Sequence, residues 1–426
     1  MDRNYLQEIV LDQFEELKRK KRGLLRHKLK EITSLVNRNT NIVITGHRRA
    51  GKSTFLYQLM DTYHKEDFYY LDFSDDRLSN FETDDFQKLV EIYVSNFKEK
   101  KIYFFDEIQG KPNWNKFVNR MYSQGCKFYI TGSNSELLSK EISTYLTGRH
   151  IDVTLFPFSF SEYLDYKQID PDYNYSKNKL VVIKELENYI KLGGFPESII
   201  YSNTDLLKTV YLDVINKDIL IRHKIKDSPL LKKIILYLIS NIGKEFSYNG
   251  IKKNFNLGSP NTSRKYINYI TDTYMLFELA KYNYSIKKQE TYSKKIYCID
   301  TGLVNKISFS FSENIGRLYE NIVFIELLRR EKEVYYWKDT TNKEVDFITL
   351  NKQKVDELIQ VCYDLSNIQT KEREISSLIM GMDYFKLNKG TIITSDLEKV
   401  EKQDKKEIRY VPLWKWLLEK DKDKAS

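Results

Sequence analysis

Residues 46–53 carry the pattern that most restricts how this chain can fold. They read GHRRAGKS and match GxxxxGK[ST] in full, and the mostly apolar residues 41–45 before them suit a buried parallel strand. Gly46 and Gly51 let the backbone curl so that its N–H groups point at phosphate oxygens. Lys52 adds positive charge at the β- and γ-phosphates, and the Ser53 hydroxyl can ligate Mg²⁺. The sequence therefore predicts a nucleotide site with Mg²⁺, formed by Gly46, His47, Arg48, Arg49, Ala50, Gly51, Lys52, Ser53 and Thr54.

A second pattern follows in the order that such a site requires. Residues 102–109 read IYFFDEIQ, an apolar strand that ends in Asp106 and Glu107. Asp106 is expected to hold Mg²⁺ through water, and Glu107 is expected to polarise the attacking water, which favours hydrolysis over binding alone. Residues 67–75 and 128–132 read as two further strands. Strands that alternate with helices predict a doubly wound α/β fold with a parallel sheet and a ligand at the carboxyl ends of the strands.

Composition and cysteine spacing limit the remaining classes. Hydrophobic residues are 41% of the 426 and aromatic residues 14%, which excludes disorder for most of the chain. The net charge of +9 permits nucleic-acid binding without requiring it. Cys126, Cys298 and Cys362 are far apart and form no CxxC pair, which argues against a disulfide scaffold or a zinc site. No signal peptide and no run near the roughly 18 apolar residues of a membrane span is evident, so a cytoplasmic protein without a membrane partner is expected.

Seven strings between about residue 40 and residue 363 are typical of one group: GHRRAGKST, YYLDFSD, FFDEIQGKPNWNKFVNRMY, ITGSNSELLSKEISTYLTGRH, FPFSFSEYL, GGFPE and KKIYCIDTGL. In this order they resemble prokaryotic AAA-type P-loop ATPases that carry a C-terminal domain of unknown function. The resemblance implies ATP as the nucleotide and a polar residue near its γ-phosphate, for which Thr131, Ser133 and Asn134 are candidates. It also implies that Arg149 acts in trans on a neighbouring copy in a homo-oligomer. The other interpretation of Arg149 is a cation at the end of a helix over residues 136–149.

Residues 229–303 are predicted to form a winged helix-turn-helix. Three helical stretches precede two strand-like runs, which flank a basic tip at Lys287 and Lys288. Ser247 is a plausible N-cap of the second helix. The third helix would enter DNA, and the small polar and basic residues at its start suit phosphate and base-edge contacts. Contact with a protein partner is the alternative. The nucleic-acid candidates are Thr262, Ser263, Arg264, Lys265, Lys287 and Lys288.

Within a predicted C-terminal domain of residues 304–426, residues 313–363 resemble the core of PD-(D/E)XK nucleases. The resemblance implies a metal held by a helix Glu, a strand Asp and an (E/D)xK pair, and Glu320 and Asp346 fit the first two positions. Gln360 stands where the third acid belongs, and Cys362 stands where the lysine belongs. A neutral thiol cannot replace an ammonium at the scissile phosphate, so an inactive nuclease-like domain is expected.

The predicted organisation is a helical segment (1–38), a P-loop ATPase core (39–156), a helical lid (157–228), the winged helix and the nuclease-like domain. The expected function is Mg²⁺-dependent ATP binding and hydrolysis coupled to a DNA-associated module. Two alternatives stay open. One is a signalling-type ATPase switch that acts through protein partners, and the other is a metal-dependent nuclease.

Overall fold

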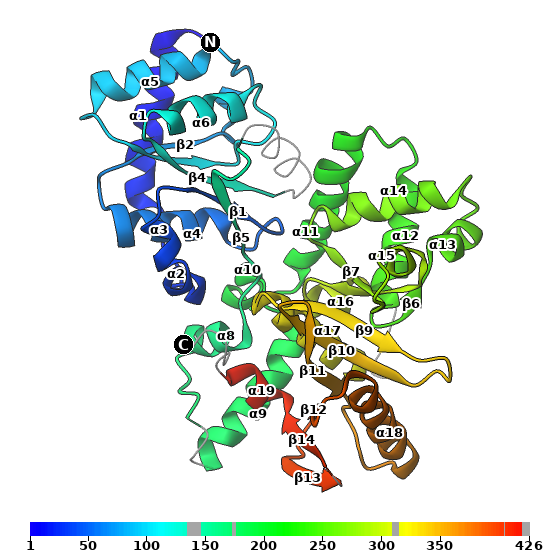
Figure 1. Cartoon of the computed structure of the whole chain (residues 1–426). Helices are drawn as coiled ribbons and strands as arrows, with labels where there is room; N and C mark the ends of the chain where they lie inside the picture. Colours follow the sequence, from blue (N-terminus) through cyan, green and yellow to red (C-terminus); the bar gives the residue numbers. More distant parts are fainter. Residues whose placement is uncertain (134–145, 173–175, 309–314, 404, 420–426) are drawn as a thin grey trace. The chain divides into compact units, whose positions relative to one another are not determined.

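The computed structural model describes residues 1–133, 146–172, 176–308, 315–403 and 405–419 (Figure 1). It divides into two compact units, one of residues 1–157 with 272–274 and the other of residues 158–271 with 275–426. Asn134 and most of the helix predicted over residues 136–149 lie outside the described residues. Within the described part, no helix is long and apolar enough to cross a membrane.

The first unit is built on a five-stranded sheet in the order β2-β3-β4-β1-β5. Every neighbouring pair in it is parallel, which confirms the predicted α/β class. The fifth strand was not predicted from the sequence: residues 146–149, expected as the end of a helix, form a turn that leads into it. The strands are β1 (Asn41–Thr45), β2 (Tyr69–Asp72), β3 (Ile102–Asp106), β4 (Lys127–Gly132) and β5 (His150–Thr154).

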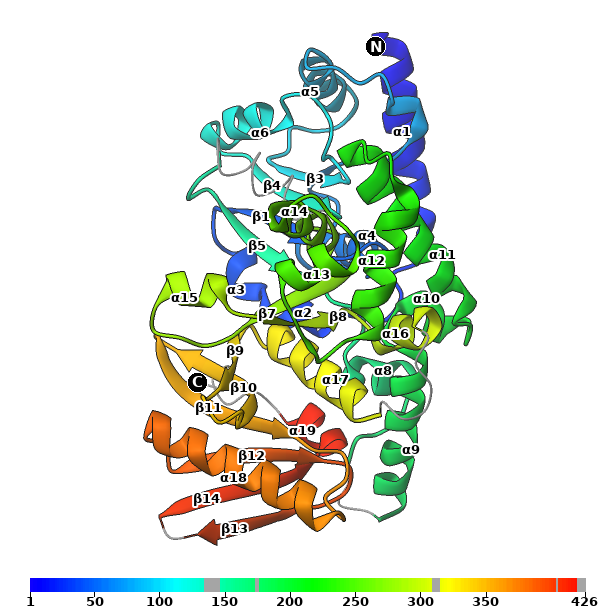
Figure 2. The ribbon, with the colours of Figure 1, turned by 90° about the vertical axis from the view of Figure 1, so that its right-hand side faces the viewer.

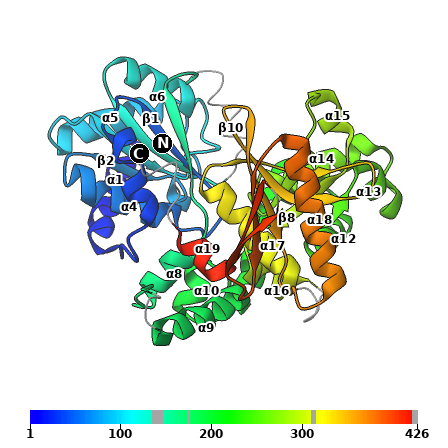
Figure 3. The same ribbon diagram turned by 60° about the horizontal axis from the view of Figure 1, so that its bottom comes forward.

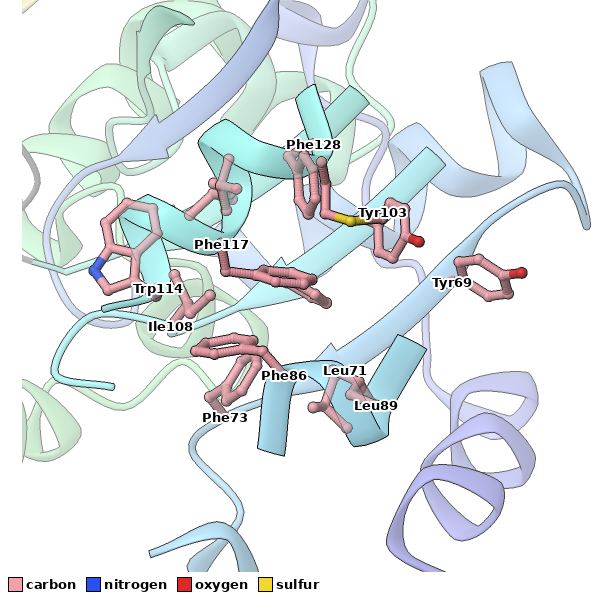
Figure 4. Close-up of a cluster of buried hydrophobic side chains, with 14 of the residues drawn as sticks. Tyr69, Leu71, Phe73, Phe86, Leu89, Tyr103, Ile108, Trp114, Phe117 and Phe128 are labelled. Atoms are coloured by element: carbon pink, nitrogen blue, oxygen red, sulfur yellow. The ribbon is translucent and has the colours of Figure 1, made fainter. Parts of the chain in front are cut away.

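Both faces of this sheet are buried because successive side chains point to opposite sides. Val43 and Phe105 belong to one apolar cluster, whereas their neighbours Ile44 and Phe104 belong to another (Figure 4 shows the first cluster). A strand buried on both faces needs apolar residues at every position, which explains the continuous runs. The first cluster includes residues of α1 (Arg3–Arg19), α5 (Asp85–Asn96) and α6 (Trp114–Ser123); the second includes residues of α2 (His27–Glu31), α3 (Thr33–Val36), α4 (Lys52–Leu59) and the π-helix η1 (Met60–His64).

In the second unit, the GGFPE and CIDTGL strings pack against each other. Asp300 Oδ2 accepts a hydrogen bond from Gly194 N at 2.5 Å, and Asp300 Oδ1 accepts one from Leu303 N at 3.0 Å. A Cβ at Gly193, where φ is +78°, would lie 2.0 Å from Asp300 Oδ1, so only glycine fits there. The helices around this junction are α8 (Phe160–Tyr166), α9 (Ser176–Leu192), α10 (Pro196–Ile200), α11 (Asp205–Asp213), the π-helix η3 (Val214–Ile221) and α16 (Thr301–Ile307).

Three helices, a small antiparallel sheet and a further short helix occupy residues 228–298 (Figure 2). The helices are α12 (Ser228–Ser240), α13 (Tyr248–Asn254) and α14 (Pro260–Thr271). Ser247 caps α13 as predicted, because its Oγ accepts a hydrogen bond from Gly250 N at 3.0 Å. The sheet order is β6-β8-β7, from β6 (Glu245–Phe246), β7 (Leu276–Ala280) and β8 (Lys294–Cys298), and the basic tip lies in a short helix, α15 (Ile286–Thr291), between β7 and β8.

The rest of the second unit is a six-stranded mixed sheet in the order β13-β14-β12-β11-β10-β9. Its first three strands along the chain are antiparallel neighbours, whereas β11, β12 and β14 run parallel. Leu378 of α18 packs with Val345 and Leu358, and Phe324 of α17 stacks on Phe347. Figure 3 shows α17 and α18 beside this sheet. The elements are α17 (Ile315–Arg329), β9 (Glu333–Lys338), β10 (Glu344–Asn351), β11 (Lys354–Val361), α18 (Ile368–Phe385), β12 (Lys389–Thr394), β13 (Lys399–Gln403), β14 (Lys406–Pro412) and α19 (Leu413–Leu418).

Candidate nucleotide site

The loop after β1 has a conformation that requires its glycines. Gly46 has φ +141°, and a Cβ there would lie 2.2 Å from the carbonyl oxygen of Leu155. Gly51 has φ +96° and immediately precedes α4. Arg49 also has a positive φ, of 68°. The backbone therefore turns sharply between β1 and α4, as the sequence pattern predicts for a phosphate-binding loop.

Lys52, the first residue of α4, is buried inside this loop. Its Nζ donates hydrogen bonds to the carbonyl oxygens of Gly46 and His47, each at 3.1 Å. It also lies 3.8 Å from Glu107 Oε1. The ammonium therefore stands between the loop and the end of β3, where a phosphate held by the loop would meet it.

Thr131, at the end of β4, links the two acidic residues that end β3. Its hydroxyl donates a hydrogen bond to Asp106 Oδ1 and accepts one from Glu107 N at 2.9 Å. The side-chain amide of Gln109 donates to Glu107 Oε2. Glu107 itself has φ +51°, a conformation that costs free energy in a non-glycine residue and that occurs often at functional sites. Of the two polar candidates that the structure describes here, Thr131 and Ser133, these contacts connect Thr131 to the acids.

Burial and nearby carboxylates shift the pKa of Asp106 at the acidic side of the site. Burial raises the pKa of Asp106 to about 7, and the nearby carboxylates of Asp72 and Glu107 add to this effect. Hydrogen bonds from the hydroxyls of Thr131 and Ser53 act in the opposite direction. Asp72 was not identified from the sequence, although it ends β2 directly opposite Asp106. The sequence feature that could have identified Asp72 is its position at the carboxyl end of a predicted parallel strand.

This donor set fits Mg²⁺. The Ser53 hydroxyl and the Asp106 carboxylate are in hydrogen-bond contact, and both are oxygen ligands of the kind that Mg²⁺ prefers. A divalent cation between them would also offset the repulsion among Asp72, Asp106 and Glu107. Ser53 and Asp106 are the residues that would hold the metal.

Comparison with known proteins gives the family. A family model described as "AAA domain" matches residues 38–164, and two models described as domains of unknown function, DUF8612 and DUF4143, match residues 183–313 and 315–416. The chain is 38% identical to the uncharacterized protein MJ1544 of Methanocaldococcus jannaschii, over 97% of this chain and 95% of that protein. It is 32% identical to an uncharacterized protein of Haemophilus influenzae, over 87% and 93%. The chain belongs to this family of AAA-domain proteins. The AAA-type assignment made from the motifs is confirmed.

Two solved structures are less similar to this AAA-domain protein than the two relatives above. The Thermotoga maritima RuvB Holliday junction branch migration motor is 14% identical with a TM-score of 0.29, covering 64% of this chain and 93% of RuvB. AMPPCP-bound DnaA from Aquifex aeolicus is 18% identical with a TM-score of 0.23, covering 57% of this chain and 86% of DnaA. Scores at this level support no argument about function.

Arg149 of the AAA-domain protein lies against α6 of its own chain. Its guanidinium donates hydrogen bonds to Asn119 Oδ1 and, at 3.4 Å, to Ser123 Oγ. It also lies over the ring of Tyr122, 5.6 Å from the centroid. These contacts fix the side chain beside the turn before β5, where it is half-buried.

The nucleic-acid candidates differ in exposure. Lys265, Lys287 and Lys288 are exposed, whereas Ser263 is fully buried and is not part of a contact surface. The guanidinium of Arg264 forms an ion pair with Glu290 of α15. Thr262 is half-buried, and its Oγ1 lies 3.1 Å from Ser259 Oγ at the start of α14.

The three nuclease-like positions come together in the second unit. Glu320 of α17 and Asp346 of β10 both contact the ammonium of Lys295. The side-chain carbonyl of Gln360 accepts a hydrogen bond from Asp346 N at 3.3 Å. Lys295 was not singled out from the sequence, because it lies in β8, before the region that resembles a nuclease.

Proposed function

We propose that this protein binds ATP together with Mg²⁺ and hydrolyses it at the site formed by the β1–α4 loop and the end of β3. The observation that supports the proposal is that Lys52 lies beside the Asp106–Glu107 pair, with Lys52 Nζ 3.8 Å from Glu107 Oε1. A positive group for phosphate, metal-binding oxygens and a carboxylate for water are the parts that phosphoryl transfer to water requires.

Each side chain has a distinct task in this proposal. Lys52 and the loop amides bind the β- and γ-phosphates, while Ser53 and Asp106 hold the metal. Mg²⁺ bound with ATP neutralises charge that develops on the phosphate oxygens. Glu107 orients the attacking water and accepts its proton. The Gln109 amide donates a hydrogen bond to the Glu107 carboxylate, and the Glu107 backbone N–H donates one to the Thr131 hydroxyl, so both side chain and backbone are held in position.

Glu107→Gln tests the assignment because it removes the base and keeps the shape. We expect ATP affinity near that of the wild type and a turnover lower by about 10²–10⁴-fold, measured as phosphate release at saturating ATP. Glu91→Gln, on the exposed surface of α5, is the matched control and should keep wild-type turnover. Wild-type hydrolysis by Glu107→Gln would show that another group positions the water.

DNA is proposed as the partner of the three-helix and small-sheet module. The arrangement of α12, α13, α14 and the β6-β8-β7 sheet supports a winged helix, and the exposed Lys265, Lys287 and Lys288 supply charge for phosphates. The ion pair of Arg264 with Glu290 and the burial of Ser263 leave fewer groups for base edges, and this favours the second candidate, a switch that acts through a protein partner.

Salt-dependent binding distinguishes the two candidates. If DNA is the partner, affinity should fall with salt, and Lys287→Gln with Lys288→Gln should lower the slope by about 2. Lys389→Gln, an exposed lysine of the same unit, is the control. The absence of a complex at low salt, with and without ATP, would favour a protein partner.

Arg149 is proposed to act on the nucleotide of a neighbouring copy in a homo-oligomer. A mass measurement with and without ATP gives the assembly, and Arg149→Ala should then lower turnover in an assembled state. Mixing Arg149→Ala with Lys52→Ala should restore part of the activity if the arginine acts in trans. A monomer with wild-type turnover in Arg149→Ala would contradict this proposal.

A further inference from the structure

A single buried lysine contacts three carboxylates in the second unit. Lys295 of β8 is only 3% exposed. Its Nζ lies 2.9 Å from Glu320 Oε1, 2.7 Å from Glu344 Oε1 and 3.2 Å from Asp346 Oδ1. A buried ammonium is costly unless it is paired, and here it is paired by oxygens from both α17 and β10. The small sheet thus supplies the cation for acids of the six-stranded sheet.

The same carboxylates have further donors. The hydroxyl of Tyr297 donates to Glu320 Oε1 at 2.6 Å, and Val361 N donates to Asp346 Oδ2 at 2.9 Å. These bonds hold the two carboxylates with oxygens turned toward Lys295. The acidic side chains are therefore oriented by the protein itself around an ammonium.

The residues present do not fit the divalent metal that the nuclease resemblance implies. Gln360, at the third metal position, donates its amide to Glu374 Oε2 at 2.5 Å and accepts from Asp346 N with its carbonyl oxygen. Mg²⁺ needs oxygens at about 2.0–2.1 Å on open octahedral positions, and an ammonium at hydrogen-bond distance from the same oxygens blocks them. In the wild-type arrangement, with Lys295 between these acids, no group of three His, Cys, Asp or Glu side chains in the described ranges could hold a metal ion.

We infer that Lys295 is the resident cation of this site: its ammonium occupies the place that a divalent ion would take between Glu320 and Asp346, and it keeps the nuclease-like region free of metal. Removing the ammonium would leave the oriented carboxylates of Glu320 and Asp346 without the cation they share, whereas Glu344 would keep its contact with Lys338 at 3.5 Å. Such a site would bind a divalent cation because carboxylate oxygens are its preferred ligands. The inference concerns residues outside the nucleotide site and does not depend on ATP hydrolysis.

The test is Mn²⁺ binding to the full chain without nucleotide, measured by electron paramagnetic resonance. Burial raises the pKa of Asp346, so the titration is run at pH 8.5, where ionisation of this carboxyl group is favoured over neutral pH. Lys295→Ala should bind one more Mn²⁺ per chain than the wild type, and Lys295→Ala/Asp346→Asn should lose it. Lys389→Ala removes the same charge from an 82% exposed side chain and should match the wild type.

Two results of the Mn²⁺ titration would overturn the inference. One is a wild-type protein that loses a bound Mn²⁺ on Asp346→Asn, because the native site would then take metal beside Lys295. The other is a folded Lys295→Ala that binds no additional Mn²⁺. Should Lys295→Ala fail to fold, Lys295→Met preserves most of the side-chain volume, and Mn²⁺ should then raise its melting temperature but not that of Lys295→Met/Asp346→Asn. Equal melting temperatures in both would also overturn it.

Discussion

Lys52 and Lys295 are both buried lysines near carboxylates, yet their surroundings differ in kind. Lys52 donates to two backbone carbonyls of a glycine-containing loop and lies 3.8 Å from one carboxylate. Lys295 lies within 3.2 Å of three carboxylates. Carbonyl oxygens carry only a partial negative charge, so a phosphate can compete with them for the Lys52 ammonium. Three carboxylates already satisfy the Lys295 ammonium. Burial of a lysine therefore says little about its role until its partners are known.

The backbone around each lysine matches this difference. Lys52 begins a helix directly after Gly51, at a point where the chain curls and a ligand can approach. Lys295 lies inside β8, where Leu279 on one neighbouring strand and Glu245 on the other fix its register. The first position is suited to a ligand that comes and goes, and the second is suited to a permanent contact.

Removing the Lys295 ammonium should have the largest effect on stability. Lys295→Ala leaves buried carboxylates without their partner and should lower the free energy of unfolding by about 3–5 kcal/mol. Urea unfolding followed by tryptophan fluorescence measures it, because Trp337, Trp414 and Trp416 lie in the second unit. Lys389→Ala should change stability by less than about 0.5 kcal/mol. A change as small as that of Lys389→Ala in the Lys295→Ala variant would mean that Lys295 contributes no more than a surface charge.

Removing the Lys52 ammonium should instead affect the ligand. Lys52→Ala loses a charge-assisted contact to phosphate, and we expect ATP affinity to fall by about 10–100-fold, measured by calorimetry. Its stability without nucleotide should change less than that of Lys295→Ala, since Lys52 donates to two neutral carbonyls and lies 3.8 Å from one carboxylate, whereas Lys295 contacts three. Unchanged ATP affinity would remove the contrast between the two lysines.

The acidic side of the nucleotide site predicts a dependence of stability on pH. The pKa of Asp106 is raised from 3.8 to about 7, so the folded state holds this proton more tightly than the unfolded state. The stability linked to the proton is complete below about pH 4 and is lost as the pH rises toward 7, by roughly 1 kcal/mol per pH unit. Asp106→Asn should remove this pH-dependent part of the free energy of unfolding. In urea unfolding, the variant should therefore gain stability relative to the wild type between pH 5 and pH 8. A constant difference would contradict the raised pKa.

The smallest effect is expected from the hydrogen bond that supports the Lys295 cluster. Tyr297→Phe deletes the donor to Glu320 and keeps the ring stacked on Phe324, so a loss of about 1 kcal/mol is expected in the same unfolding assay. Tyr335→Phe removes a more exposed hydrogen bond, to Glu333, and serves as the control. An equal change in both variants would indicate that Tyr297 does not orient Glu320.

Local sequence patterns predicted the strands β1 to β4, because apolar runs and the glycines of the loop are set by neighbours along the chain. The strand β5 was missed, since His150–Thr154 has alternating polar residues typical of an edge rather than of a buried strand. Asp72 was missed for a different reason: its approach to Asp106 comes from strand pairing and not from spacing.

The sequence by itself determined the phosphate-binding loop, the acidic end of β3 and the alternation of strands with helices that predicts a parallel sheet, because each is a pattern of residues close together in the chain. It also indicated that Gln360 and Cys362 depart from a metal site. Only the tertiary structure decided what neutralises Glu320 and Asp346: the ammonium of Lys295 reaches them from a strand 25 and 51 residues earlier in the chain. A contact of this kind is set by how distant elements pack, and no local pattern carries it.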